Sequence, residues 1–441
     1  MKPTGLIAAC GVLAVLGGTV WWTKQHPKKP ESTTPDAPKV LALGEDQIEG
    51  ITISQNGAAP IILKKAGDKW QLETPKPLPA DQDAVKALVA SLANLQSDRL
   101  IDQHPAGLAE FGLTEPTATI DVAVKGGTVN KLLLGADNPS GSATYVKLAS
   151  NPSVYTLLSS VKANLTKSVT DLRDKRLLTF DREKVTGVAV TPAKGPAFEF
   201  GRNGQEWTLV KPRPMRADSP GVDDLLRKLS DAKMDLAPGN EDEKKNAAEF
   251  ASGTQVATIS VRDNSGPQVL TLRKTKDNAF YARSSVTEGT WKVAGDLGDS
   301  LKDKELASFR NKKLFDFGFN DPGKVEINGA AYQKSSDKWT GPTGQVDPTT
   351  IQIVIDRLRD LSASSFSDKP AAGTPALTLA VTAGDKNKVE KVTAVKVGET
   401  LSAQREGDPE GYILDSKTVD ELQKAIAGIK PFQAPKPEKK K

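Results

Sequence analysis

The chain has 441 residues, 37% of them hydrophobic, with 60 Lys and Arg against 55 Asp and Glu and a formal net charge of +5. This length is typical of about three domains, and the mean hydropathy of −0.40 favours several small cores over one large core. The weak, interspersed charge excludes the clustered basic surface of a nucleic-acid binder. A single cysteine, Cys10, excludes an intrachain disulfide.

An uncharged segment, residues 5–22, follows a short N-terminus of residues 1–4 and ends in Trp21 and Trp22. As a helix it would reach roughly 27 Å, enough to cross the hydrocarbon core of a bilayer. Tryptophans suit the membrane interface, and their bulk disfavours cleavage by signal peptidase. We therefore expect an uncleaved transmembrane anchor, with a cleaved signal peptide as the alternative.

The charges around this segment bear on its orientation. Lys2 favours a cytoplasmic N-terminus, whereas Lys24, Lys28 and Lys29 favour the reverse. Because a short N-terminus usually stays inside while the long part translocates, we expect a single-pass protein of the bacterial inner membrane with an extracytoplasmic body. A body facing the cytoplasm is the alternative. The Pro- and Lys-rich residues 23–38 predict a linker.

Three similar segments follow the linker. Tryptophans at 70, 207 and 339 each precede a Pro-containing stretch, then an Asp and an apolar helical stripe, and the first two copies keep a constant offset of 137 positions. We therefore predict repeat units at 39–180, 181–317 and 318–432, followed by a basic tail at 433–441.

Each repeat has the same predicted order of elements. Alternating apolar residues predict strands at 49–53 and 187–190, and the next strand carries the Trp. Apolar residues at i, i+3, i+4 and i+7 then predict an amphipathic helix. Further strands, at 119–122, 258–261 and 378–381, precede a second, shorter helix. The predicted fold is thus α+β: a transmembrane helix and three tandem repeats of a small, mostly antiparallel sheet with two helices.

An Asp stands four residues before the first apolar position of each predicted helix: Asp81, Asp218 and Asp347. A carboxylate there accepts hydrogen bonds from the free N–H groups of the first turn. The alternative is a pair of catalytic carboxylates, as glycosidases use. Recurrence in every repeat favours the helix caps.

A basic motif, at residues 172–180 and 309–317, ends the first two repeats and is missing from the third. Since it occurs only where another repeat follows, it predicts a joint between units. Its cations are also candidate interface or anion contacts: Arg173, Lys175, Arg176, Arg310, Lys312 and Lys313. Basic side chains whose stems cover apolar surface are the alternative interpretation.

Other site chemistry has little basis in the sequence. His26 and His104 are the only histidines, and no zinc or nucleotide motif occurs. We therefore predict no catalytic residue, no cofactor and no metal. The repeat tryptophans are expected in the core, with sugar-stacking platforms as the alternative.

The chain resembles a known family through the Trp strand, the Asp-capped helix, Phe-Gly-Leu-Thr-Glu-Pro at 111–116 and Arg-Asp-Lys-Arg-Leu-Leu at 173–178. This is the bacterial domain of unknown function 4340 (DUF4340). Its members are often encoded beside gliding-motility-type ABC transporter components, which implies an envelope accessory role.

Together these observations predict a non-catalytic, membrane-anchored envelope protein that binds or scaffolds protein partners, with a role as an accessory to an ABC transporter as the leading version. A carboxylate-dependent cell-wall or glycan-processing enzyme is the alternative. The sequence does not predict a small-molecule ligand, a particular partner or an oligomeric state.

Overall fold

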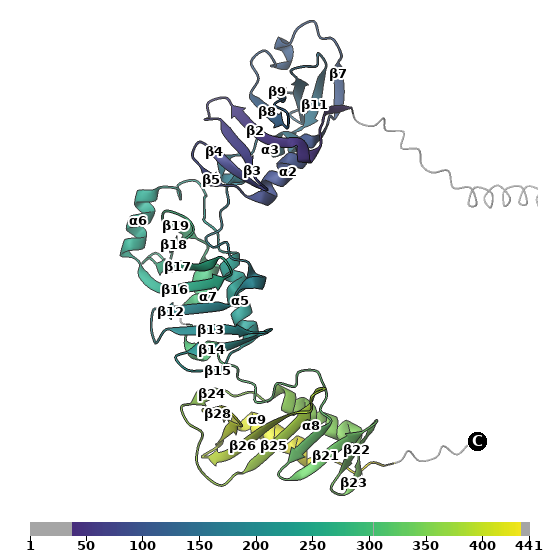
Figure 1. Ribbon diagram of the computed structural model, residues 1–441, viewed down its shortest axis with the longest axis vertical. Coiled ribbons are helices and arrows are strands. Elements are labelled where there is room, and N and C mark those ends of the chain that lie inside the picture. Colours follow the sequence, from purple (N-terminus) through teal and green to yellow (C-terminus); the bar gives the residue numbers. More distant parts are fainter. Residues whose placement is uncertain (1–37, 303, 434–441) are drawn as a thin grey trace, which may run out of the picture. The chain divides into compact units, whose positions relative to one another are not determined.

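The computed structural model describes residues 38–302 and 304–433, which form two compact units with a boundary between Lys175 and Arg176 (Figure 1). The first unit holds one repeat and the second holds two. Each repeat is built on one large sheet, and every strand pairing among the described residues is antiparallel.

In repeat 1, two meanders meet at the centre of a nine-stranded sheet of order β5-β4-β3-β2-β8-β9-β10-β11-β7. The strands are β2 Ile48–Gln55, β3 Ile61–Ala66, β4 Lys69–Thr74, β5 Leu78–Pro79, β7 Arg99–Asp102, β8 Ala118–Val124, β9 Val129–Asp137, β10 Ala143–Leu148 and β11 Val154–Leu158. The helices are α2 Gln82–Ala93, α3 Ser159–Leu165 and α4 Val169–Leu172. A separate two-stranded sheet joins β1 Lys39–Ala42 to β6 Asn94–Gln96.

Repeat 2 has the same plan in an eight-stranded sheet of order β15-β14-β13-β12-β16-β17-β18-β19. The strands are β12 Gly187–Pro192, β13 Phe198–Asn203, β14 Glu206–Lys211, β15 Met215–Arg216, β16 Thr254–Asp263, β17 Gly266–Lys274, β18 Phe280–Ser284 and β19 Trp291–Val293. The helices are α5 Ser219–Ser230, α6 Glu243–Ser252 and α7 Gly295–Leu301, of which α6 was not predicted.

Repeat 3 repeats the nine-stranded plan in the order β23-β22-β21-β20-β25-β26-β27-β28-β24. The strands are β20 Lys324–Ile327, β21 Ala330–Ser335, β22 Lys338–Gly341, β23 Gly344–Val346, β24 Ser365–Ser367, β25 Leu377–Ala383, β26 Lys388–Val397, β27 Thr400–Arg405 and β28 Gly411–Leu414. The helices are α8 Pro348–Asp360 and α9 Ser416–Ala427. Short 3₁₀ turns lie at Glu45–Gln47, Ala109–Phe111, Arg182–Lys184 and Leu306–Phe309.

The core of each repeat lies between one face of the sheet and its two main helices. In repeat 1, Leu88 and Leu92 of α2 share one buried cluster with Ile51, Leu63 and Leu72 of the sheet. The strands alternate buried and partly exposed side chains, because successive residues of a strand point to opposite faces. The repeat tryptophans lie in these cores: Trp70, Trp207 and Trp339 are 8%, 2% and 3% exposed.

Over the second meander, described residues also cover the opposite face of the sheet in repeats 1 and 2. In repeat 1, Phe111 and Leu113 pack there with Tyr145 and Val154, in a cluster separate from the main core. A Cβ on Gly135 would lie 2.1 Å from the Phe111 carbonyl oxygen, so this close approach requires glycine. The Phe-Gly-Leu segment of the family resemblance therefore has a packing role.

Repeat 2 covers the same part of its sheet with α6. The ring of Phe250 lies 5.0 Å from the guanidinium of Arg273 on β17 and 4.5 Å from that of Arg283 on β18. These arginines alternate with the core residues Leu272 and Ala282, which places α6 on the face opposite the core. In repeats 1 and 2, no helix of the described residues covers the first meander on this face.

The predicted fold class is wrong in two respects. Four antiparallel sheets dominate the described chain, and their strands make up a larger share of it than the predicted α+β repeats with two helices each imply. No helix within 38–302 and 304–433 is long and apolar enough to span a membrane, since the longest, α8, has 13 residues and only one buried face. The predicted anchor at 5–22, and with it the expected membrane contact, lies outside the described residues.

Candidate functional site

The three recurring aspartates each lie at the start of a helix in their own repeat. Asp81 accepts hydrogen bonds from the backbone N–H groups of Asp83 and Ala84, both at 3.1 Å. Asp347 accepts one from Thr349 at 2.8 Å. Asp218 occupies the same position, but its carboxylate makes no capping hydrogen bond.

This difference predicts that substitution of Asp81 and of Asp218 will lower the stability by unequal amounts. We expect Asp81→Ala to lower the free energy of unfolding of repeat 1 by about 0.5–2 kcal/mol, because the first turn of α2 loses its acceptor. Asp218→Ala should cost less than about 0.5 kcal/mol, the range of ordinary surface changes. Hydrogen exchange of peptides from α2 and α5 measures both effects. Equal losses at the two positions would contradict the finding that Asp81 caps its helix and Asp218 does not.

Each repeat is closed by a segment that pairs with the residues before its main helix. In repeat 1, the N–H of Asp81 donates to the Leu172 carbonyl at 2.8 Å. In repeat 2, the N–H of Asp218 donates to the Phe309 carbonyl at the same distance. In repeat 3, which lacks the basic motif, the N–H of Asp347 donates to the Lys430 carbonyl at 2.9 Å.

In the second unit, the basic motif continues from this closure into the next repeat. The N–H of Leu314 donates to the Leu361 carbonyl at 3.0 Å, and the N–H of Ala363 donates to the Lys312 carbonyl at 2.9 Å. The backbone of the motif thus contacts repeat 2 on one side and repeat 3 on the other. We call residues 309–317, with the side chains that surround them, the repeat 2–3 joint.

A network of charged side chains fills this joint. Arg216, at the end of β15 in repeat 2, donates to both carboxylate oxygens of Asp316, at 2.6 and 2.7 Å, and to the Lys313 carbonyl at 2.8 Å. Its guanidinium also lies 3.5 Å from Asp408 and 3.4 Å from the Tyr412 hydroxyl of repeat 3. Both bonds to Asp316 come from one guanidinium nitrogen, Nη2, while the other terminal nitrogen, Nη1, faces Lys313, Asp408 and Tyr412.

Arg405, on β27, forms the centre of the same network. It donates to Glu390 at 2.7 Å and to the Leu314 carbonyl at 3.0 Å, and it lies 3.4 Å from Asp316. The side chains of Arg405 and Glu390 are only 12% and 4% exposed. The Asp316 N–H donates to the second oxygen of Glu390 at 2.7 Å. The two buried charges therefore satisfy one another and the backbone of the joint.

Arg310, one of the predicted anion contacts, binds side chains of the protein itself. Its guanidinium lies 3.5 Å above the ring of Phe366 and 3.1 Å from the carboxylate of Glu410, which is 3% exposed. Arg173, its counterpart in repeat 1, is also buried, at 7% exposed. Arg176, Lys312 and Lys313 are exposed and Lys175 is half-buried, so the structure does not gather the six cations into one site.

Electrostatics in the joint keep Glu390 charged. Burial raises its pKa, but the Asp316 N–H, the ammonium of Lys388 and the charge of Arg405 outweigh burial and bring the pKa below the ordinary 4.5. Burial and the hydrogen bond to Asp408 raise the pKa of Tyr412, so the phenol stays neutral and donates to that carboxylate.

The lowered pKa of Glu390 predicts that repeat 3 loses stability in acid. Because its pKa is lower in the folded protein, its contribution is fully present above about pH 4.5 and is lost as the pH falls through the folded value. We expect the free energy of unfolding of repeat 3 to fall more steeply below pH 4.5 in the wild type than in Glu390→Gln. Urea titrations at several pH values measure both slopes, and equal slopes would contradict this assignment.

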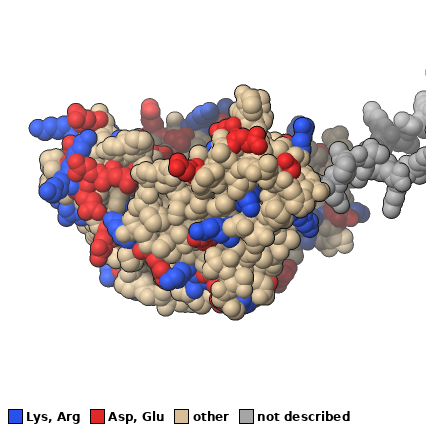
Figure 2. All heavy atoms as spheres, turned by 90° about the horizontal axis from the view of Figure 1, so that it is seen from above, with Lys and Arg blue, Asp and Glu red and all other residues tan. Residues whose placement is uncertain are grey.

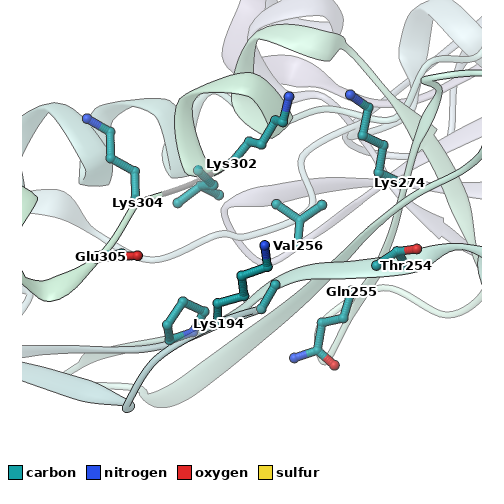
Figure 3. A pocket seen from close by; sticks show the side chains of 11 residues that line it. Lys194, Thr254, Gln255, Val256, Lys274, Lys302, Lys304 and Glu305 are labelled. Carbon is teal, nitrogen blue, oxygen red and sulfur yellow. The ribbon is translucent and has the colours of Figure 1, made fainter.

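A pocket of about 220 Å³ lies in repeat 2 (Figure 3). Its walls come from the end of β12, the start of β16, the end of β17 and the segment after α7. Lys194, Lys274, Lys302 and Lys304 surround it, with Val256 between them in the view of Figure 3. The sequence did not indicate this pocket, because its lysines are spread over 110 positions without a motif.

The surface carries both signs of charge. On the face that Figure 2 shows, Lys and Arg lie beside Asp and Glu over much of the surface. Within 38–302 and 304–433, no group of three or more His, Cys, Asp or Glu side chains is arranged to hold a metal ion. His104 lies in an exposed turn after β7.

The fold and the joint define a class of protein built from tandem antiparallel-sheet repeats, each closed by a short segment that pairs with the residues before its main helix. The chain belongs to the family described as Domain of unknown function (DUF4340), whose model matches residues 70–208 and then 207–380. The two matches begin at Trp70 and Trp207, equivalent positions of repeats 1 and 2. No curated protein and no solved structure matches the chain.

Proposed function

We propose that this protein is a non-catalytic scaffold of a bacterial envelope complex, accessory to an ABC transporter, with its body outside the cytoplasm. The repeat 2–3 joint is the observation that carries the proposal. Its buried ion pairs and backbone bonds link two sheets through a short segment, which favours one body over two freely moving domains.

The open faces of the first meanders supply the binding surface. Thr208 on β14 is half-buried, Val210 beside it is 45% exposed, and Gln333 on β21 is exposed. Polar and small side chains on a broad sheet face suit contact with another protein. The placement of Asp81 and Asp347 as helix caps supports a binding role over a carboxylate-dependent enzyme.

Photo-crosslinking in cells tests the scaffold role. A benzoylphenylalanine at Thr208 or Gln333 should give a crosslink to an extracytoplasmic part of a transporter subunit, identified by mass spectrometry. Ile353, 48% exposed on α8, is the control position on the helix side. No crosslink from either sheet position, or the same products from Ile353, would contradict the proposal.

Reporter fusions test the location. The uncharged segment at residues 5–22 supports export of the body. Alkaline phosphatase fused after Phe432 should be active in cells, whereas a fluorescent protein that matures only in the cytoplasm should be dark. The opposite pattern would place the body in the cytoplasm and contradict an envelope role.

A further inference from the structure

Repeats 1 and 2 differ at one strand position that lines the pocket of repeat 2. In repeat 1, the Gln55 side chain at the end of β2 donates to the carbonyl of Thr166, the residue that caps the C-terminus of α3, at 3.4 Å. The equivalent residue of β12 is Pro192, since Gln55 pairs with Ala118 and Pro192 pairs with Ala257 at matching positions of the two sheets. Proline has no side-chain donor, so this link to the helix end is missing in repeat 2.

The wall opposite Pro192 is also specific to repeat 2. Strand β8 begins at Ala118, whereas β16 begins three residues before its counterpart Ala257. The additional residues Thr254, Gln255 and Val256 line the pocket, and Val256 is 8% exposed. Leu301, the last residue of α7, is 2% exposed and adds a second apolar side chain. The floor is therefore apolar.

The rim of the pocket is cationic. Lys194, Lys302 and Lys304 are exposed, and none of them forms an ion pair with another described residue. Lys274 lies over the ring of Phe280, with its ammonium 5.2 Å from the ring centre. Glu305 is the one carboxylate among the described lining residues. These four lysines line one opening, and their combined positive charge attracts an anion.

We propose that this pocket binds a single-chain amphiphile with an anionic head, a carboxylate or a phosphate, whose first methylenes lie on Val256 and Leu301 and whose head lies among the lysines. The volume of about 220 Å³ is below the roughly 300–1,000 Å³ of pockets that enclose drug-sized ligands, so only the head-proximal part of the chain is enclosed. The site is independent of the sheet faces proposed for protein partners.

Titration calorimetry on the full chain tests this site with dodecanoate and dodecyl phosphate, both below their micellar concentrations. Saturable binding of either at one site per chain is the expected result, and the better ligand distinguishes a fatty carboxylate from a lipid phosphate. Equal binding of neutral dodecyl maltoside would overturn the role of the lysines. If inorganic phosphate, which has no alkyl chain, bound as tightly as dodecyl phosphate, the role of the apolar floor would be overturned.

Two variants locate the binding. Lys194→Gln, Lys302→Gln and Lys304→Gln together should weaken binding at least ten-fold, whereas the same change at the exposed Lys244, Lys245 and Lys276 should leave it within two-fold. Pro192→Gln, which restores the residue of repeat 1, should also weaken it by filling the pocket. Circular dichroism checks that each variant is folded. Unchanged affinity in folded forms of both pocket variants would overturn the proposal.

Discussion

Replacing Arg405 by Ala should lower the free energy of unfolding of repeat 3 by about 3–5 kcal/mol, the usual cost of removing one partner of a buried ion pair. The loss arises because Glu390, 4% exposed, is left with only the Lys388 ammonium and the Asp316 N–H to offset its burial, and because the Leu314 carbonyl loses its donor. Hydrogen exchange of peptides from β25, β26 and β27 measures the stability of this repeat directly.

A matched control lies in the same repeat. Arg357 pairs with Glu421 at 3.0 Å, but both side chains are well exposed, at 50% and 39%. Arg357→Ala should therefore cost at most about 1 kcal/mol, because exposed pairs are weakened by solvent and salt. Similar losses at Arg405 and Arg357 would show that the joint does not behave as a buried network.

Trp207→Ala should destabilise repeat 2 by about 3–5 kcal/mol, through lost burial and the cavity left behind. The indole is 2% exposed, and its N–H donates to Asp223 at 2.8 Å, so the substitution also removes a partner from that carboxylate. Thermal unfolding followed by circular dichroism measures the loss.

The control for Trp207 is its neighbour Val210, which is on the same strand but 45% exposed on the open face. Val210→Ala should change the stability by no more than about 0.5 kcal/mol. If Trp207 instead served as a sugar-stacking platform, its replacement would leave the stability unchanged and abolish glycan binding, which would contradict its place in the core.

Local patterns predicted the elements that depend on neighbouring residues. The apolar stripe starting at Val85 predicted α2, and the Asp before it predicted the cap that Asp81 forms. By contrast, α6 has Phe250 as its only large apolar residue and gave no stripe. Its position depends on Arg273 and Arg283 from distant strands, which no local pattern encodes.

The joint and the pocket could not be predicted from the sequence, because both depend on residues that are far apart along the chain. Arg216 and Tyr412 are 196 positions apart, and only the closing of both sheets brings them together. The basic motif suggested a joint, but it gave no sign that Arg216 would pair with Asp316 of the motif itself and with Asp408 of repeat 3, or that Arg310 would pair with Glu410 of repeat 3. The pocket is lined by Pro192, which stands where repeat 1 has a glutamine, a difference that acquires meaning only once the strand register is known.

The most direct test of the scaffold is the distance distribution between repeats 2 and 3. Spin labels on cysteines introduced at Thr208 and Gln333, in a chain carrying Cys10→Ser, report it by pulsed electron paramagnetic resonance. A single narrow distribution that broadens on Arg216→Gln would show that the joint holds the two repeats as one body. A broad distribution in both proteins would contradict that account.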